Sequence, residues 1–145
     1  MTRRGLLLAV AALTLAAGCG ITYADYGSEP RPAVIDLGAP DAPQVVVPRE
    51  VRVGVPFTVR VTTFGGGCVD KGFTEVAAGA SEADVRPYDF HPTDENAPCT
   101  RELRSHLHEA SVRLEQPGTG TVRVHGRRMR DGEPVTVTRA ITITL

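Results

Sequence analysis

Apolar and polar residues alternate along much of the chain from residue 44 onward. The clearest run is residues 57–63, where Phe57, Val59 and Val61 are separated by polar side chains. Successive side chains of a strand point to opposite faces, so this period of two predicts a strand with one buried face. The alternation recurs at residues 110–115, at 122–124 and from 135 to 145, with weaker strand patterns around 73–78 and 83–88.

Turn-forming sequences separate these runs. Three glycines follow the first strand at 65–67, Pro-Gly-Thr-Gly occupies 117–120, and Arg-Asp-Gly-Glu at 130–133 is typical of a hairpin. Residues 89–105 are polar, contain Pro92 and Pro98, and are expected to form a long loop. Close turn spacing without a helical period predicts an all-β domain over residues 44–145, an antiparallel β-sandwich of about seven strands.

Residues 19–43 differ in composition from the rest of the chain. They hold prolines at 30, 32, 40 and 43 and few large apolar side chains. A segment of this composition buries too little apolar surface to offset its loss of conformational entropy on folding. We therefore expect residues 19–43 to be a flexible tether.

The first 18 residues have the layout of a secretory signal peptide. Arg3 and Arg4 precede an apolar run over 6–17, and small residues lead directly to Cys19. The run of about 12 residues is shorter than the roughly 20 that a membrane-spanning helix needs. An ordinary cleaved signal peptide without lipid is one interpretation of this layout.

The sequence Ala-Ala-Gly-Cys at 16–19 also resembles the lipobox of bacterial lipoproteins. In that family the peptide is cut before the cysteine, whose thiol carries diacylglycerol. The resemblance implies that residues 1–18 are removed and that a lipid on Cys19 anchors the protein in the cell envelope, outside the cytoplasm. Gly20 stands where enterobacterial lipoproteins retained in the inner membrane have Asp, so the outer membrane is favoured if the host has two membranes.

Two further cysteines remain once Cys19 carries lipid. Cys68 and Cys99 would then lie in an oxidising compartment, where a disulfide between them is expected. Closing the loop between these two cysteines stabilises the folded state by about 3–4 kcal/mol in the chain-entropy model. The alternative is a pair of redox or metal-binding thiols, although no Cys-x-x-Cys motif is present.

The succession of strands over residues 44–145 resembles immunoglobulin-like domains of bacterial surface proteins. The chain has no tryptophan, so the buried tryptophan of antibody domains is absent. Cys99 precedes the fifth expected strand, so the bridge would not match the antibody disulfide. It would instead join the 89–105 loop to the end of the strand before Cys68.

Charge and length limit the classes of function. The 145 residues carry a formal net charge of −1 and no block of basic residues, which gives no indication of nucleic-acid binding. The length suits one folded domain after the signal and tether. Nucleophile-elbow and phosphate-loop motifs are absent from the sequence, and no cofactor is expected.

His106 and His108 are the leading candidates for chemistry. Residues that are two positions apart on a strand lie on the same face of the sheet. These histidines could therefore bind one metal ion, with His91 as a third ligand. Extending the register of the 110–114 run places both toward the core and Leu107 outward. A bulge or a later strand start would reverse these faces.

Two charged segments offer weaker candidate sites. Asp89, Asp94, Glu95 and Asn96 supply oxygen ligands of the kind that calcium prefers, without the spacing of a calcium loop. Arg127, Arg128 and Arg130 flank a turn, where they could contact lipid head groups or anionic envelope polymers. A solvated loop and a solvated hairpin end are the alternative interpretations.

The sequence therefore predicts a non-catalytic envelope lipoprotein that binds or scaffolds. Its expected partners are the membrane, through Cys19, and an envelope protein or polymer. A metal-binding periplasmic lipoprotein using His106 and His108 is the first alternative, and an enzyme with a site built from the 89–105 loop is the second.

Overall fold

The computed structural model describes residues 27–38 and 43–145, and this part of the chain is all-β. It contains no helix, and accordingly no apolar helix that could cross a bilayer. Its strands are β1 (Ser28–Pro32), β2 (Val34–Asp36), β3 (Val45–Val46), β4 (Glu50–Arg52), β5 (Phe57–Gly65), β6 (Asp70–Ala78), β7 (Glu82–Pro92), β8 (Arg104–Val112), β9 (Gly118–Arg128) and β10 (Pro134–Thr144).

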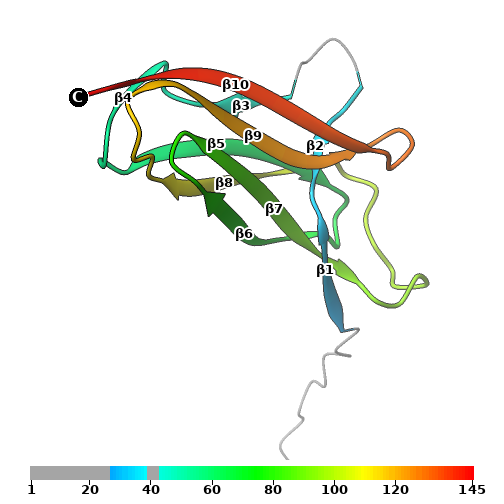
Figure 1. Ribbon diagram of the computed structural model, residues 1–145. Helices are drawn as coiled ribbons and strands as arrows, with labels where there is room; N and C mark the ends of the chain where they lie inside the picture. The colour runs from blue at the N-terminus through cyan, green and yellow to red at the C-terminus, as the bar shows by residue number, and fades with distance from the viewer. Residues whose placement is uncertain (1–26, 39–42) are drawn as a thin grey trace, which may run out of the picture.

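The strands form two groups that share one core. Strands β6, β7, β9, β10 and β4 are hydrogen-bonded in that order, while β3 and β8 flank β5. Figure 1 shows β9 and β10 above β5 and β8. The inward side chains of these four strands are buried together: Val59, Val61, Ala110, Val112, Val122, Val124, Ile141 and Ile143.

Two contacts between the groups shape the sheet. Strand β2 pairs with both β5 and β9, which joins the groups into one ten-stranded sheet that is not closed. Strand β6 lies beside β8 without a backbone ladder. Side-chain hydrogen bonds bridge this gap, from Thr74 to His108 and from His106 to the Val69 carbonyl.

The expectation of a purely antiparallel sandwich of about seven strands is wrong in two respects. The described residues form ten strands, because four short ones precede β5. Three of the pairings are parallel, namely β4 with β10, β2 with β9 and β7 with β9. The β7–β9 pair is parallel because the chain crosses to the other group as β8 and returns in its original direction.

The expected tether is also wrong for the part that the structure describes. Strands β1 and β2 occupy most of residues 27–38, and Ala33 and Ile35 are fully buried. Strand β1 pairs only with β7, and an edge strand tolerates prolines because a missing N–H interrupts no ladder on its outer side. The rest of the expected tether up to residue 26, with Cys19 and the signal segment, lies outside the described residues.

The predicted turns and bridge are confirmed with shifted boundaries. Strand β7 runs to Pro92 and β8 begins at Arg104, so the long loop covers 93–103 rather than 89–105. The β9–β10 hairpin turns at Gly132, whose φ of 72° suits glycine. The Cys68–Cys99 disulfide joins the β5–β6 turn to the 93–103 loop, with the two Cα atoms 5.3 Å apart.

Candidate functional site

A fork between β7 and β9 creates the site that we consider functional. The two strands pair in parallel from Glu82 to Val85 and from Thr121 to Val124, and then separate. Beyond the fork, β1 pairs with the far half of β7, and β2 pairs with the end of β9. The chain between β1 and β2 therefore passes through the opening of the fork.

Backbone hydrogen bonds fix this crossing. The Ala33 amide donates to the Pro87 carbonyl at 2.9 Å, and the Ala33 carbonyl accepts from the Arg127 amide at 2.9 Å. Gly126 makes the close approach possible, since a Cβ there would lie 2.8 Å from the Ala33 carbonyl oxygen and from Ile35. The fork is thus a preformed feature of the backbone.

A cavity of about 300 Å³ opens at the fork, and we call it the fork pocket. Its apolar lining includes Pro32 of β1, Pro134 of β10 and Tyr88, whose ring stacks on Phe73 at 5.0 Å between centroids. None of the described residues that line it is a carboxylate. The lining residues are Pro32, Arg86, Pro87, Tyr88, His125, Gly126, Arg127 and Pro134.

Two guanidinium groups reach the fork pocket from opposite sides. The Arg127 Nε donates to the Pro32 carbonyl at 2.8 Å, which occupies one of the five N–H donors of that side chain. Arg86 makes no hydrogen bond or ion pair with any residue in the described ranges; Glu75 lies opposite it in the β6–β7 ladder. The pocket therefore combines apolar walls with cationic donors.

His125 is held in place by two partners. Its Nε2 lies 2.5 Å from Asp84 Oδ1, and its Nδ1 lies 3.1 Å from Thr136 Oγ1. The hydrogen bond with His125 lowers the pKa of the Asp84 carboxyl, and the charges of His125, Arg123 and Arg86 outweigh the opposing effect of burial. Asp84 is therefore ionised at neutral pH, and its charge is engaged by His125 and Arg123.

Thr136, His125 and Asp84 follow the contact order of a hydrolase triad, hydroxyl to imidazole to carboxylate. Thr136 lies opposite His125 in the β9–β10 ladder and is absent from the pocket lining. Because Thr136 does not line the cavity, we assign Thr136 and Asp84 to orienting the imidazole.

A second triplet of the same residue types is buried. His108 Nε2 lies 2.8 Å from Asp89 Oδ1, and His108 Nδ1 lies 2.9 Å from Thr74 Oγ1. The His108 and Asp89 side chains are each 1% exposed. Burial raises the pKa of the Asp89 carboxyl, but the hydrogen bond and charge of His108, the nearby Thr63 hydroxyl and the Gly72 amide outweigh it, so the pKa falls below its usual value.

The buried triplet leaves two polar atoms without a hydrogen bond, Asp89 Oδ2 and Thr63 Oγ1. The Thr63 hydroxyl is close enough to affect the carboxyl pKa, but its geometry falls short of a hydrogen bond. A buried, incompletely satisfied carboxylate depends strongly on the partners that it keeps. We therefore interpret His108 and Asp89 as a structural pair.

The histidines predicted as metal ligands are not brought together. The register prediction is confirmed, since His108 is buried and Leu107 is exposed. Both ring nitrogens of His108 are hydrogen-bonded, and His106 Nε2 contacts the Val69 carbonyl at 3.1 Å. His91 is on β7 opposite Glu29 of β1. Within residues 27–38 and 43–145, no group of three His, Cys, Asp or Glu side chains could hold a metal ion.

Zinc titration checks this conclusion. We expect no stoichiometric heat of binding when zinc or copper is added to the full chain, because His108 would have to break two hydrogen bonds inside the core to become a ligand. The His106→Ala/His108→Ala double variant is the control. Metal binding that is present in the wild type and lost in the double variant would contradict the structural interpretation.

The two charged segments also separate in the structure. Asp89 is buried on β7, whereas Asp94 accepts from the Asn96 amide within the 93–103 loop, so the expected calcium ligands do not converge. In the basic segment, Arg127 lines the fork pocket while Arg128 pairs with Asp36 and Asp131. Arg127, which the sequence suggested as a contact for lipid head groups or anionic polymers, is thus a residue of the fork pocket.

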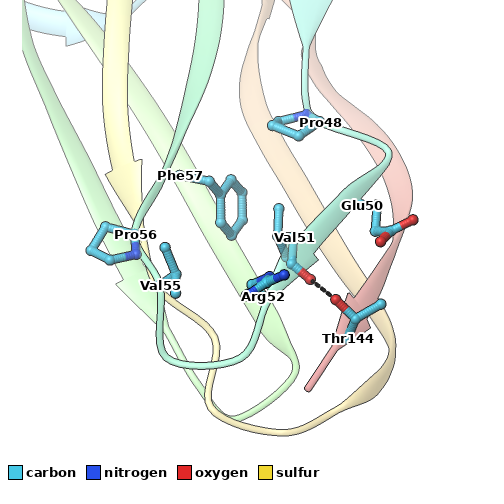
Figure 2. Close-up of a pocket in the computed structure, with 8 residues that line it drawn as sticks. All are labelled: Pro48, Glu50, Val51, Arg52, Val55, Pro56, Phe57 and Thr144. Carbon is cyan, nitrogen blue, oxygen red and sulfur yellow. Dashed lines mark hydrogen bonds between the residues drawn. The ribbon is translucent and has the colours of Figure 1, made fainter.

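A second cavity of about 340 Å³ lies at the other end of β10, between the turns that flank β4. Figure 2 shows its lining, with Val55 and Phe57 facing Val51 and with Thr144 Oγ1 bonded to the Val51 carbonyl. Glu50 and Arg52 line it with opposite charges. We prefer the fork pocket because its ionic side chains share one sign and converge on one cavity.

Comparison of this chain with protein-family models, with curated proteins and with solved structures found no match. Function is therefore inferred from the site itself.

Proposed function

We propose that this protein is a non-catalytic binding module, held outside the cytoplasm by a lipid on Cys19, and that the fork pocket is its binding site. The observation that carries the proposal is the convergence of Arg86, Arg127 and Tyr88 on one preformed cavity. Ligand sites are commonly apolar cavities of this kind with a few convergent polar groups.

The Cys68–Cys99 disulfide supports the proposed location. Structural disulfides persist in oxidising compartments and are rare in the cytoplasm, so the bridge is compatible with export. The lipobox-like sequence before Cys19 supplies the independent argument for an anchor. Strand β1 begins at Ser28, nine residues after Cys19 (28 − 19 = 9), so the proposed anchor lies close to the sheet in sequence.

The immunoglobulin-like sandwich remains part of the proposal. The antiparallel β5–β8 pair packing across a core from the β9–β10 pair supports it. The parallel β7–β9 pairing departs from such domains, and it is this departure that opens the fork.

A binding role has more support than the two alternatives. A metal-binding lipoprotein would need ligands other than His106, His108 and His91, which the structure keeps apart. An enzyme would need a group at the cavity that is free to attack a substrate or to transfer a proton, and both ring nitrogens of His125 are hydrogen-bonded within the protein. The lining also supplies arginines and a tyrosine. These groups are suited to recognition of a ligand, since each offers a fixed donor or an apolar surface.

Replacement of the proposed lipid-bearing cysteine tests the anchor. We expect Cys19→Ser to move the chain from the membrane fraction to the soluble fraction, because no thiol remains to carry diacylglycerol. Intact mass spectrometry should show wild-type chains that start at Cys19 and carry lipid. The control is Ala24→Ser, which adds the same side chain nearby and should stay in the membrane fraction. Soluble wild-type protein, or a Cys19→Ser chain that stays in the membrane, would refute the anchor.

A further inference from the structure

We propose that the fork pocket binds a small ligand in which an apolar ring carries an oxyanion, a carboxylate or a phosphate. This inference rests on the proposed binding role and adds the chemical class of the ligand. It follows from the walls of the cavity, from its two arginines and from its size.

The walls suit a flat apolar group. Pro32 and Pro134 line the pocket with rings that have little conformational freedom, and Tyr88 is supported by Phe73. Contacts with such side chains cost little conformational entropy when a ligand is bound, because few rotamers have to be fixed. A rigid ring therefore fits this lining better than a flexible polar chain.

The arginines of the pocket form no ion pair within the described residues, although Arg86 lies opposite Glu75 in the β6–β7 ladder and its charge lowers the pKa of Asp84. Arg86 has no ion pair within the described part of the chain, and Arg127 has N–H donors beyond the one bound to Pro32. Asp84 is engaged by His125 at 2.5 Å and by Arg123 at 3.6 Å, whereas Arg86 acts on it through its charge alone. Two guanidinium groups at one cavity match an oxyanion in charge and in geometry.

Arg127 also acts on a neighbouring histidine. Burial is the main cause that lowers the pKa of His91, and the charges of Arg127 and Arg31 lower it further, while Asp89 and Glu29 oppose them. Arg31 itself is paired with Glu29 on the surface. Arg86 and Arg127 consequently remain the two cations available to a ligand in the pocket.

The size of the cavity limits the ligand. About 300 Å³ is at the lower end of the range for small-molecule sites. A single ring with one charged substituent is therefore the natural probe, and benzoate is the simplest example. Benzyl alcohol has the same ring without the charge, phenyl phosphate exchanges the carboxylate for a phosphate, and inorganic phosphate has the charge without the ring.

Titration followed by ¹H–¹⁵N NMR of the full chain in detergent micelles tests the proposal. We expect benzoate or phenyl phosphate to shift the amides of Ala33, Gly126 and Arg127 saturably, with a Kd of about 0.1–1 mM for so small a ligand. Benzyl alcohol and inorganic phosphate should each bind about tenfold more weakly, because each lacks one half of the recognition. The stronger of the two oxyanion probes identifies the preferred anion.

Two matched variants locate the site. Arg86→Gln should weaken binding of the oxyanion probe about tenfold, since it removes a charge-assisted hydrogen bond without breaking a contact within the protein. Arg52→Gln removes the same charge at the second cavity and should leave the affinity unchanged. Unchanged dispersion of both spectra will confirm that the variants are folded.

Three outcomes would overturn the proposal. They are equal binding of benzoate and benzyl alcohol, a loss of affinity in Arg52→Gln rather than Arg86→Gln, and the absence of saturable shifts with both oxyanion probes. The fractionation of Cys19→Ser is independent of this titration. A failed titration with a confirmed anchor would remove the ligand class, whereas a failed anchor with successful titration would remove the location.

Discussion

Replacing His108 with leucine is expected to lower the free energy of unfolding by about 3–5 kcal/mol at pH 7, the cost of leaving a buried carboxylate without its partner. The substitution removes the hydrogen bond that holds Asp89 Oδ1 at 2.8 Å, while Asp89 Oδ2 already lacks a partner. Urea unfolding followed by circular dichroism measures the loss as a lower midpoint with an unchanged slope.

A double variant separates the lost pairing from lost packing. In Asp89→Leu/His108→Leu no charge remains in the core, so we expect most of the stability lost in His108→Leu to be regained. A double variant as unstable as the single one would show that packing volume, and not the orphaned carboxylate, sets the cost.

The partly exposed triplet of Asp84, His125 and Thr136 is a natural control for the buried triplet of Asp89, His108 and Thr74. His125 contacts a carboxylate and a threonine hydroxyl as His108 does, but its side chain is 31% exposed. Water can solvate Asp84 when the imidazole is removed, so His125→Leu should cost at most about 1 kcal/mol. Similar losses in the two variants would contradict the assignment of His108 as a buried structural partner.

The dependence of stability on pH tests the same explanation, that Asp89 loses its partner in His108→Leu. The Asp89 pKa is lowered in the folded wild type, so this carboxylate stabilises the fold above the unfolded pKa of about 3.9, and the contribution disappears as the pH falls through the folded pKa. In His108→Leu the hydrogen bond and the charge of His108 are lost, so burial is opposed only by Thr63 and the Gly72 amide and the Asp89 pKa should rise. Protonation then stabilises the variant, so the difference from the wild type should narrow between pH 7 and pH 4.

The strands with one buried face could be predicted from the sequence because burial imposes the period directly. Val59 and Val61 are fully buried or nearly so, as are Val122 and Val124, and each lies where the alternation placed it. The register extended correctly to His108 as well. What the alternation could not show is that the polar side chain at this inward position has a buried acidic partner on β7.

Strands β1 and β2 could not be predicted because their stability comes from distant residues. Ser28–Pro32 has the composition of a linker, yet it pairs with β7 about sixty residues later in the chain. Composition reports how much apolar surface a segment can bury on its own. It contains no information about an edge of β7 that β9 leaves unpaired.

The fork pocket was missed for a related reason. Arg86 and Tyr88 alternate with buried residues on β7 in the pattern of any half-exposed strand. Only the parallel β7–β9 pairing and its separation after Val85 turn these two side chains toward a cavity. Parallel pairing arises from the path of the chain through β8, which local periodicity does not encode.

Removal of the disulfide is the second change with a large expected effect. The Cys68→Ser/Cys99→Ser double variant should lose about 3–4 kcal/mol of stability in the chain-entropy model for the observed separation of 31 residues. The same denaturation should show a lower midpoint and a steeper slope, because the unfolded chain without the bridge exposes more surface. Addition of reductant to the wild type should reproduce both changes.

The structure indicates that this loss arises in the unfolded state. The Gly67 amide donates to the Thr100 carbonyl at 3.1 Å, and Arg104 donates to the Gly67 carbonyl at 3.3 Å, so the 93–103 loop stays attached beside the β5–β6 turn without the bridge. The amide spectrum of the folded double variant should therefore match that of the wild type at the fork pocket and at the His108–Asp89 pair. Widespread shifts at those places would mean that the bridge instead shapes the native sheet, and a loss below about 1 kcal/mol would contradict the entropic account.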